Sequence, residues 1–226
     1  MANKGNNRHV KRLASGNYLK LHRKASAYVA KPSSGRHSGS SSISLSTVLI
    51  EKLALAENAR EARYAIKNGL VKVNGKAVSE ERYPVGFSDV ISVPDGGDSY
   101  LVGVGKRGAF SIEKLEKGME VPFKVIGKYL ARGGKQMIRL HNGRILAHSG
   151  DAKVNDSILL DAGKTGKVIR MEEGAKCYVL NGAHASESGT IKGIKPGSAL
   201  RSPIVEIEGS SGSFETSMEN IIAVSK

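Results

Sequence analysis

The first 42 residues of the chain carry nine lysine and arginine side chains and no aspartate or glutamate. They include few large apolar residues, and residues 33–42 are almost entirely serine and glycine. Such a segment buries too little apolar surface to offset the conformational entropy that folding removes, so we expect it to be largely extended or disordered when free. Its charge predicts that it becomes ordered against a polyanion. The alternative is a tail that only increases solubility.

Net charge is distributed unevenly over the rest of the 226-residue chain, whose overall net charge is +14. Residues 43–97 are neutral, residues 98–171 carry +7, and residues 172–226 carry −2. The single cysteine, Cys177, excludes an internal disulfide framework and a multi-cysteine zinc site, and it favours a reducing compartment. Apolar runs are far shorter than the ~20 residues that span a bilayer. We therefore expect a soluble protein that is not exported and has no membrane partner.

Two helices are predicted after the basic segment. Ser46 is the expected N-cap of the first helix, which runs to about residue 56. Asn58 is the expected N-cap of a second helix over residues 59–68, and Gly69 follows where a left-handed C-terminal cap belongs. The first helix carries leucine and alanine at near-helical spacing, and the second carries a stripe of Ala59, Ala62, Ala65 and Ile66, which predicts that each buries one side.

The second helix places three cations on one face. Arg60, Arg63 and Lys67 are spaced so that their side chains leave the same side of the helix, which is not the apolar side. The next residues include Asn74-Gly75, the dipeptide favoured in two-residue type I′ hairpins. Strands are expected at residues 70–73, 76–78 and 89–93.

The residues between 58 and 91 resemble a known family. Their order of helix, glycine, strand, Asn-Gly-Lys and Asp-Val-Ile is similar to the small RNA-binding domain that bacterial ribosomal protein S4 shares with some RNA-modifying enzymes. In that family the second helix and the adjoining hairpin form the RNA-facing surface. By position, the resemblance implies that RNA is contacted here by Arg60, Arg63, Lys67, Lys72 and Lys76.

A narrower resemblance runs nearly end to end. Residues 9–14, 31–35, 83–91 and 133–144 together resemble the archaeal and eukaryotic S4e family of small-subunit ribosomal proteins, and an archaeal member is implied. Gly16, Tyr18 and Arg36 depart from the family, which has proline, tryptophan and proline there. The family implies a cytoplasmic, structural constituent of the small ribosomal subunit that binds and stabilises rRNA during assembly and translation. Its partners would be small-subunit rRNA and neighbouring small-subunit ribosomal proteins.

In the basic segment, the residues that we expect to contact RNA are Lys4, Arg8, His9, Lys11, Arg12, Lys20, Arg23, Lys24, Lys31 and Arg36. Residues 98–171 read as short strands between glycine-rich turns, which predicts an aliphatic β domain. Its expected strands are residues 100–104, 109–112, 123–130, 136–140, 158–160 and 167–170. Arg132, Lys135 and Arg144 lie in its cationic turns and are expected phosphate contacts.

The last part, residues 172–226, resembles the KOW motif, a small β-barrel element of ribosomal proteins and transcription elongation factors. The resemblance rests on residues 174–179, Gly182 and residues 189–194. Strands at residues 204–208, 213–216 and 221–224 would complete an SH3-like barrel. Because this part has a net charge of −2, a protein-facing role and RNA contacts through Lys192, Lys195 and Arg201 both remain open.

No enzymatic constellation is found. Residues 103–108 match G-x-G-x-x-G but belong to no βαβ unit, and residues 163–165 end like a P-loop that lacks its first glycine. Arg-Leu-His at residues 139–141 lacks the aspartate of a pseudouridine synthase, and Cys177 reads as a structural thiol. We therefore expect no catalytic residue, metal, cofactor or small-molecule substrate. The alternatives are an RNA-modification enzyme or its RNA-targeting subunit, and a transcription elongation factor.

The predicted fold is therefore α+β and multi-domain. It comprises a basic extended tail (1–42), an S4-type RNA-binding domain (43–97), a central β domain (98–171) and a KOW-like β-barrel (172–226).

Overall fold

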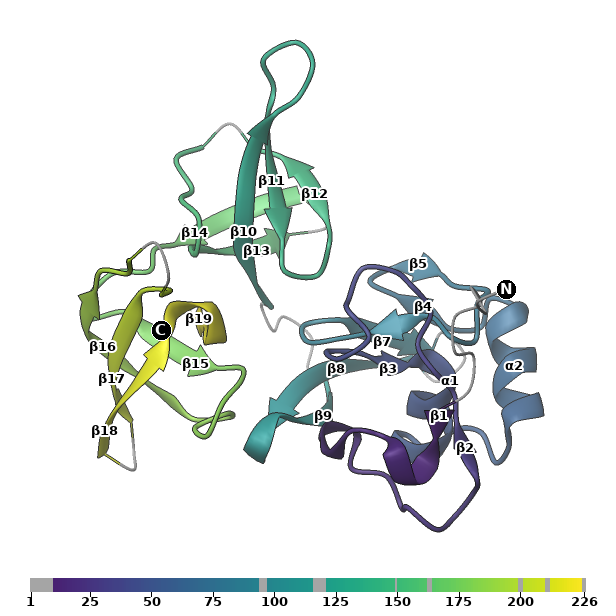
Figure 1. Ribbon diagram of the computed structural model, residues 1–226. Helices are drawn as coiled ribbons and strands as arrows, with labels where there is room; N and C mark the ends of the chain where they lie inside the picture. The colour runs from purple at the N-terminus through teal and green to yellow at the C-terminus, as the bar shows by residue number, and fades with distance from the viewer. Residues whose placement is uncertain are drawn as a thin grey trace, which may run out of the picture. The chain divides into compact units, whose positions relative to one another are not determined.

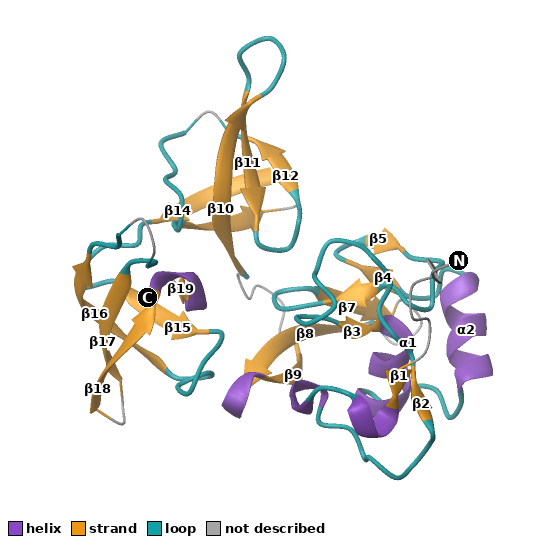
Figure 2. Ribbon diagram, viewed as in Figure 1, coloured by secondary structure: helices purple, strands orange, loops and turns teal. Residues whose placement is uncertain are grey.

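A computed structural model of the chain describes residues 10–93, 97–115, 121–148, 150–161, 164–198, 201–209 and 212–224. The chain divides into two compact units. The first runs to Gly103 and includes Ala109–Glu116, and the second comprises Val104–Gly108 and the chain from Lys117 onward. Helices occur mainly in the first unit, and strands make up most of the rest, so the fold is α+β (Figures 1 and 2).

The basic segment is folded over residues 10–42, so the prediction of an extended or disordered tail is wrong there. Strand β1 (Val10–Lys11) pairs antiparallel with β2 (Tyr28–Val29), and two short 3-10 helices, Arg12–Ala14 and Asn17–Leu19, lie between them. Leu19 is buried in the core of the first unit, and the ring of Tyr18 meets Phe110 edge to face, with centroids 5.9 Å apart. A few apolar side chains therefore attach this largely polar segment to the core of the first unit.

The first predicted helix, capped by Ser46 and ending near residue 56, is present but with different bounds, since helical backbone covers residues 45–52. Ile43–Ser44 form strand β3, which pairs with β6 (Pro84–Val85), and Ser44 occupies the N-cap position of the short helix α1 (Leu45–Thr47). A π-helical turn follows over Val48–Lys52. The amide of Ser46 donates to the carbonyl of Glu81, so long-range pairing decides where this helix starts.

The second predicted helix is confirmed. Helix α2 (Ala59–Lys67) is capped by Asn58, whose side-chain oxygen accepts hydrogen bonds from the amides of Arg60 and Glu61, each at 3.0 Å. Its buried side consists of Ala62 and Ile66. Gly69 follows with φ of 72°, a left-handed conformation that glycine adopts without a steric penalty.

The hairpin after α2 belongs to a five-stranded sheet with the order β5-β4-β7-β8-β9. Asn74 and Gly75 have φ of 52° and 77°, as a type I′ turn requires. The strands are β4 (Lys72–Val73), β5 (Lys76–Ala77), β7 (Val90–Val93), β8 (Asp98–Gly105) and β9 (Ala109–Lys114). Because β8 and β9 extend this sheet, the boundary expected at residue 97 lies too early.

The second unit contains two antiparallel five-stranded sheets. The first has the order β12-β11-β10-β13-β14 and packs Phe123, Val125, Ile138 and Ile158 into its core. Its strands are β10 (Pro122–Leu130), β11 (Gln136–Leu140), β12 (Ile145–Ala147), β13 (Ser157–Asp161) and β14 (Lys164–Ile169). The short strand β12 was not predicted.

The other sheet has the order β18-β17-β16-β15-β19. Its strands are β15 (Lys176–Val179), β16 (Ser188–Lys195), β17 (Ile204–Gly209), β18 (Gly212–Ser217) and β19 (Ile221–Ala223). Gly189 packs so closely on β17 that an added Cβ would lie 2.5 Å from the carbonyl oxygen of Glu208. The core contains Val179, Ile191 and Ile207.

Candidate RNA-binding surface

Three cations of α2 lie on its exposed side, as their spacing predicted. Arg60, Arg63 and Lys67 are exposed, whereas Ala62 and Ile66 face the core. Among the described residues, neither Arg60 nor Lys67 has an ion-pair partner. Their charges are therefore available to an external anion.

Arg63 has an internal partner. Its guanidinium donates two hydrogen bonds to the carboxylate of Glu81, at 2.6 and 3.2 Å, and these bonds raise the pKa of Arg63. The side chains of Arg63 and Glu81 are 53% and 30% exposed. A pair this accessible to water contributes little to stability, so a phosphate can compete with Glu81 for Arg63.

An exposed tyrosine stands among these cations and was missed by the sequence reasoning. Tyr64 is 68% exposed and follows Arg60 by four residues, so the two side chains are neighbours on α2. An exposed aromatic ring beside cations can stack on an unpaired base. The spacing of Tyr64 from Arg60 is the signal that could have identified it.

The adjoining hairpin adds two lysines to the same unit. Lys72 lies on β4 and Lys76 on β5, and both side chains are exposed. Val73, between them in sequence, is buried in the core. The alternation of inward and outward residues along β4 explains why Lys72 faces solvent.

The structure separates the cations of the basic segment into groups. Those that are exposed are Lys11, Lys20, Arg23 and Lys24, and those that are half-buried are Lys31 and Arg36. The expected contacts Lys4, Arg8 and His9 lie outside the described residues. Arg12 belongs to neither group.

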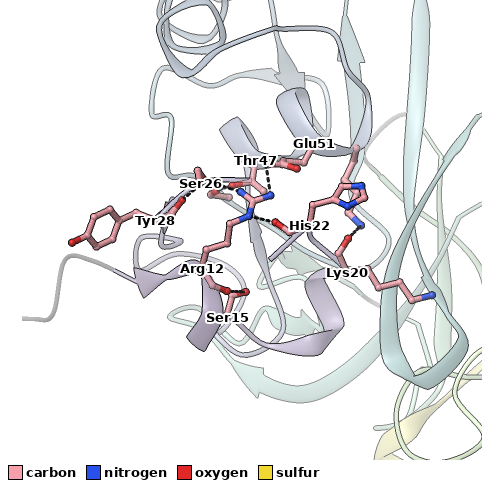
Figure 3. A network of polar contacts seen from close by, with 10 residues as sticks. Arg12, Ser15, Lys20, His22, Ser26, Tyr28, Thr47 and Glu51 are labelled. Carbon is pink, nitrogen blue, oxygen red and sulfur yellow. Dashed lines mark hydrogen bonds and ion pairs between the residues drawn. The ribbon is translucent and has the colours of Figure 1, made fainter. Parts of the chain in front are cut away.

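Arg12 is buried, with only 3% of its surface exposed, although we expected it to contact RNA. Its guanidinium donates to the carboxylate of Glu51 at 2.7 Å, to the hydroxyl of Ser26 at 3.0 Å and to the carbonyl of His22 (Figure 3). Its own amide donates to the carbonyl of Ala27 at 2.9 Å. The charge of Arg12 is therefore used inside the protein, where it holds residues 22–27 against the turn after α1.

A second buried cluster attaches the end of the basic segment. The Nε2 atom of His37 lies 2.8 Å from a carboxylate oxygen of Asp89, and Asp89 also accepts from the side chain of Asn74 at 2.7 Å and from the amide of Gly86 at 3.0 Å. Both His37 and Asp89 are buried. Because Asn74 is in the hairpin turn, this cluster ties the basic segment to the hairpin that carries Lys76.

In the second unit, the turn between β10 and β11 projects from its sheet (Figure 1). Arg132 and Lys135 are exposed in this turn, beside Gly133 and Gly134, which have φ of 82° and 70°. Tyr129 and Leu130, 45% and 71% exposed, precede the turn. Arg144 is half-buried.

Lys124 on β10 is a buried cation that the sequence did not reveal. It is 5% exposed, and its ammonium donates to the carbonyls of Met218, Glu219 and Ile221 at 2.6, 3.2 and 2.9 Å. Burial lowers the pKa of Lys124 to about 8. These hydrogen bonds join the two sheets of the second unit. Because its ammonium is buried between them, Lys124 is not available to RNA.

The motifs that resemble catalytic sites have other roles. Burial raises the pKa of the Cys177 thiol to about 11, so this cysteine stays protonated near neutral pH and is a poor nucleophile. Residues 106–108 of the glycine motif form a turn between two strands, and Lys164 begins a strand. Within the described ranges, no three metal-ligating side chains gather, and no helix is long and apolar enough to cross a membrane.

Comparison with known proteins agrees with this geometry. The S4 domain family matches residues 45–91, which include α2 and the hairpin. Small ribosomal subunit protein eS4 of Methanococcus aeolicus is 34% identical over 99% of this chain and 96% of its own length. The chain belongs to the eS4 family. The eS4 protein of Archaeoglobus fulgidus is 33% identical over 96% of this chain and 93% of that protein.

A solved eS4-family structure matches as well. The crystal structure of the 30S ribosomal protein S4e from Thermoplasma acidophilum has a TM-score of 0.69 and 30% identity, and the match covers 82% of this chain and 96% of that one. The resemblance to the S4e family is therefore confirmed. Membership in the eS4 family supports a structural ribosomal role, and neither these relatives nor this structure supports an RNA-modification enzyme or an elongation factor.

Proposed function

We propose that the chain is a non-catalytic structural component of the small ribosomal subunit that binds and stabilises rRNA through its first unit. The observation that carries this function is the exposed cationic side of α2, placed beside the lysines of an adjoining hairpin. Arg60 and Lys67 supply charges with no ion-pair partner in the described part of the chain, and Tyr64 supplies an aromatic face. Phosphate contacts fix position, while folded rRNA is recognised mainly by shape.

The proposed RNA contacts keep the predicted residues except Arg12, which is buried. Those in the described part of the chain are Lys11, Lys20, Arg23, Lys24, Lys31, Arg36, Arg60, Arg63, Lys67, Lys72, Lys76, Arg132, Lys135 and Arg144. Lys4, Arg8 and His9 remain proposals from the sequence. The location that follows is the cytoplasmic ribosome, with neighbouring small-subunit proteins as further partners.

We assign the C-terminal five-stranded sheet to the KOW type. The close packing of Gly189 against β17 supports this assignment, because a side chain at that position would collide with the backbone. Two of its cations are paired with carboxylates: Lys192 lies 3.3 Å from Glu208, and Lys195 is bonded to Glu215. Together with the net charge of −2 over residues 172–226, this favours a surface that faces protein more than RNA, although these exposed pairs are as open to competition as Arg63–Glu81.

The test is the salt dependence of binding between the full-length chain and small-subunit rRNA. Each phosphate contact that is lost should lower the slope of log K against log salt by about 1, so the double variant Arg60→Ala, Lys67→Ala should lower it by about 2. The matched control is Lys192→Ala with Lys195→Ala, which removes the same charge from the C-terminal sheet. Equal slopes in the two double variants would refute the assignment to α2.

A further inference from the structure

A cationic pocket lies on the basic segment. Its volume is about 540 Å³, within the range of sites that hold a small ligand. The residues that line it are Lys11, Leu13, Arg23, Lys24, Ser26, Ala27 and Tyr28. Three of these seven are cations, and no acidic side chain of the described part of the chain lines the pocket. Its charge therefore complements an anion.

The pocket also presents apolar surface to solvent. Leu13 is 67% exposed and Tyr28 is 57% exposed. Lys11 and Tyr28 are directly opposite each other in the pairing of β1 with β2, so their side chains leave the same face. An aromatic ring thus lies beside an ammonium group, a combination that accepts both the base and the phosphate of a nucleotide.

The loop that carries the other two cations is held in place from inside. The carbonyl of His22 accepts from the guanidinium of Arg12 and from the amide of Ala25, which closes the turn containing Arg23 and Lys24. Arg12 also bonds the hydroxyl of Ser26 on the far side of this turn (Figure 3). Both ends of the loop are therefore fixed to one buried side chain.

Arg23 is oriented by polar contacts of its own. Its guanidinium donates to the carbonyl of Leu13 at 3.4 Å and to the side-chain oxygen of Asn17. These contacts hold the guanidinium at the backbone of Leu13 and leave other N–H groups for a phosphate, because a guanidinium carries five donors. The pocket is therefore preorganised, which lowers the entropic cost of binding.

We propose that this pocket binds one unpaired nucleotide of RNA, with its base stacked on Tyr28 against Leu13 and its phosphates held by Lys11, Arg23 and Lys24. The inference rests on the proposed rRNA-binding function and adds a specific subsite to it. A base within a duplex is stacked on both sides and presents no free face to Tyr28, so the ligand is single-stranded. Stacking tolerates any base, so the pocket selects for unpaired structure more than for sequence.

The experiment measures binding of the full-length chain to a fluorescent eight-residue oligouridylate and, separately, to small-subunit rRNA. Tyr28→Phe keeps the ring, whereas Tyr28→Leu keeps apolar bulk without it. We expect Tyr28→Phe to bind oligouridylate within about twofold of the wild type and Tyr28→Leu to bind roughly 10-fold more weakly, the loss expected for one stacked base. Arg23→Ala with Lys24→Ala should lower the salt slope by about 1.4, the value for two phosphates of a single strand. Tyr28→Leu should leave the slope unchanged.

Each result distinguishes the subsite from the wider function. Unchanged oligouridylate binding by Tyr28→Leu, or equal loss in Tyr28→Leu and Tyr28→Phe, overturns the stacking assignment. If the wild type still binds rRNA in that case, the proposed function stands and only the assignment of the pocket to a nucleotide fails. If the wild type does not bind rRNA, the proposed function fails first. If polyglutamate of equal length displaces labelled oligouridylate as well as unlabelled oligouridylate does, the pocket binds acidic polypeptides, and its assignment to a nucleotide is wrong.

Discussion

Replacement of Arg12 by methionine should release the basic segment from the rest of the first unit. The substitution keeps the apolar part of the side chain but removes the hydrogen bonds to Glu51, Ser26 and the carbonyl of His22. Breaking a buried ion pair by removing one partner costs about 3–5 kcal/mol when the other charge stays buried. Here Glu51 is 22% exposed, so water can solvate its carboxylate after the loss of Arg12.

The expected cost is therefore about 2–3 kcal/mol, near the value for hydrogen bonds to charged groups. Because the chain has two units, a single free energy of unfolding is not well defined for it. Hydrogen exchange of a peptide that covers residues 10–29 measures the local opening instead. A loss of about 2–3 kcal/mol corresponds to a fall in amide protection of roughly 30- to 150-fold.

Two comparisons make this prediction refutable. Lys24→Met removes an exposed cation of the same loop and should change protection by less than about threefold. Combining Arg12→Met with Glu51→Gln should cost less than the sum of the two single variants, because they share one ion pair. If Arg12→Met lowers protection no more than Lys24→Met does, the inference that Arg12 holds this segment is wrong.

Further substitutions test single contacts elsewhere. The folded-state pKa of Lys124 is lowered to about 8, so the unfolded chain binds more protons between pH 8 and its ordinary pKa near 10.4. Stability of the second unit should therefore rise with pH over this interval, by about 3 kcal/mol at most, and urea titrations should show no such rise in Lys124→Met. Gly189→Ala should destabilise the second unit by about 1–3 kcal/mol through overpacking, whereas Gly193→Ala, where an added Cβ meets nothing nearer than 4.0 Å, is its control. Asn58→Ala should cost α2 about 1 kcal/mol by loss of its cap, and Asn58→Asp should restore most of it in urea denaturation.

Local signals were enough to predict α2 and the hairpin. Asn58 and Gly69 mark the ends of the helix, and Asn74-Gly75 specifies the turn, all through interactions within a few residues. The spacing of cations along α2 likewise predicted its exposed charged side. These features depend on periodicity and backbone preference, which a sequence displays directly.

Long-range partners explain the predictions that failed. Composition suggested that residues 10–42 could not fold, but Arg12 pairs with Glu51 and His37 with Asp89, 39 and 52 residues further along the chain. The start of the first helix was misplaced because β3 pairs with β6, far away in sequence. In the cationic pocket of the basic segment, Tyr28 gained significance only through its pairing opposite Lys11. None of these partners can be read from local spacing.

The order already present in residues 10–42 has a calorimetric consequence. A disordered tail that folded onto rRNA would bury about 1,000–3,000 Å² on binding and give a large negative heat-capacity change with an unfavourable entropy. In this chain the apolar contacts of Leu19 and Tyr18 form during folding of the protein itself. Association with RNA through this segment should therefore have a small heat-capacity change, and its entropy should be dominated by the release of counterions from the phosphates.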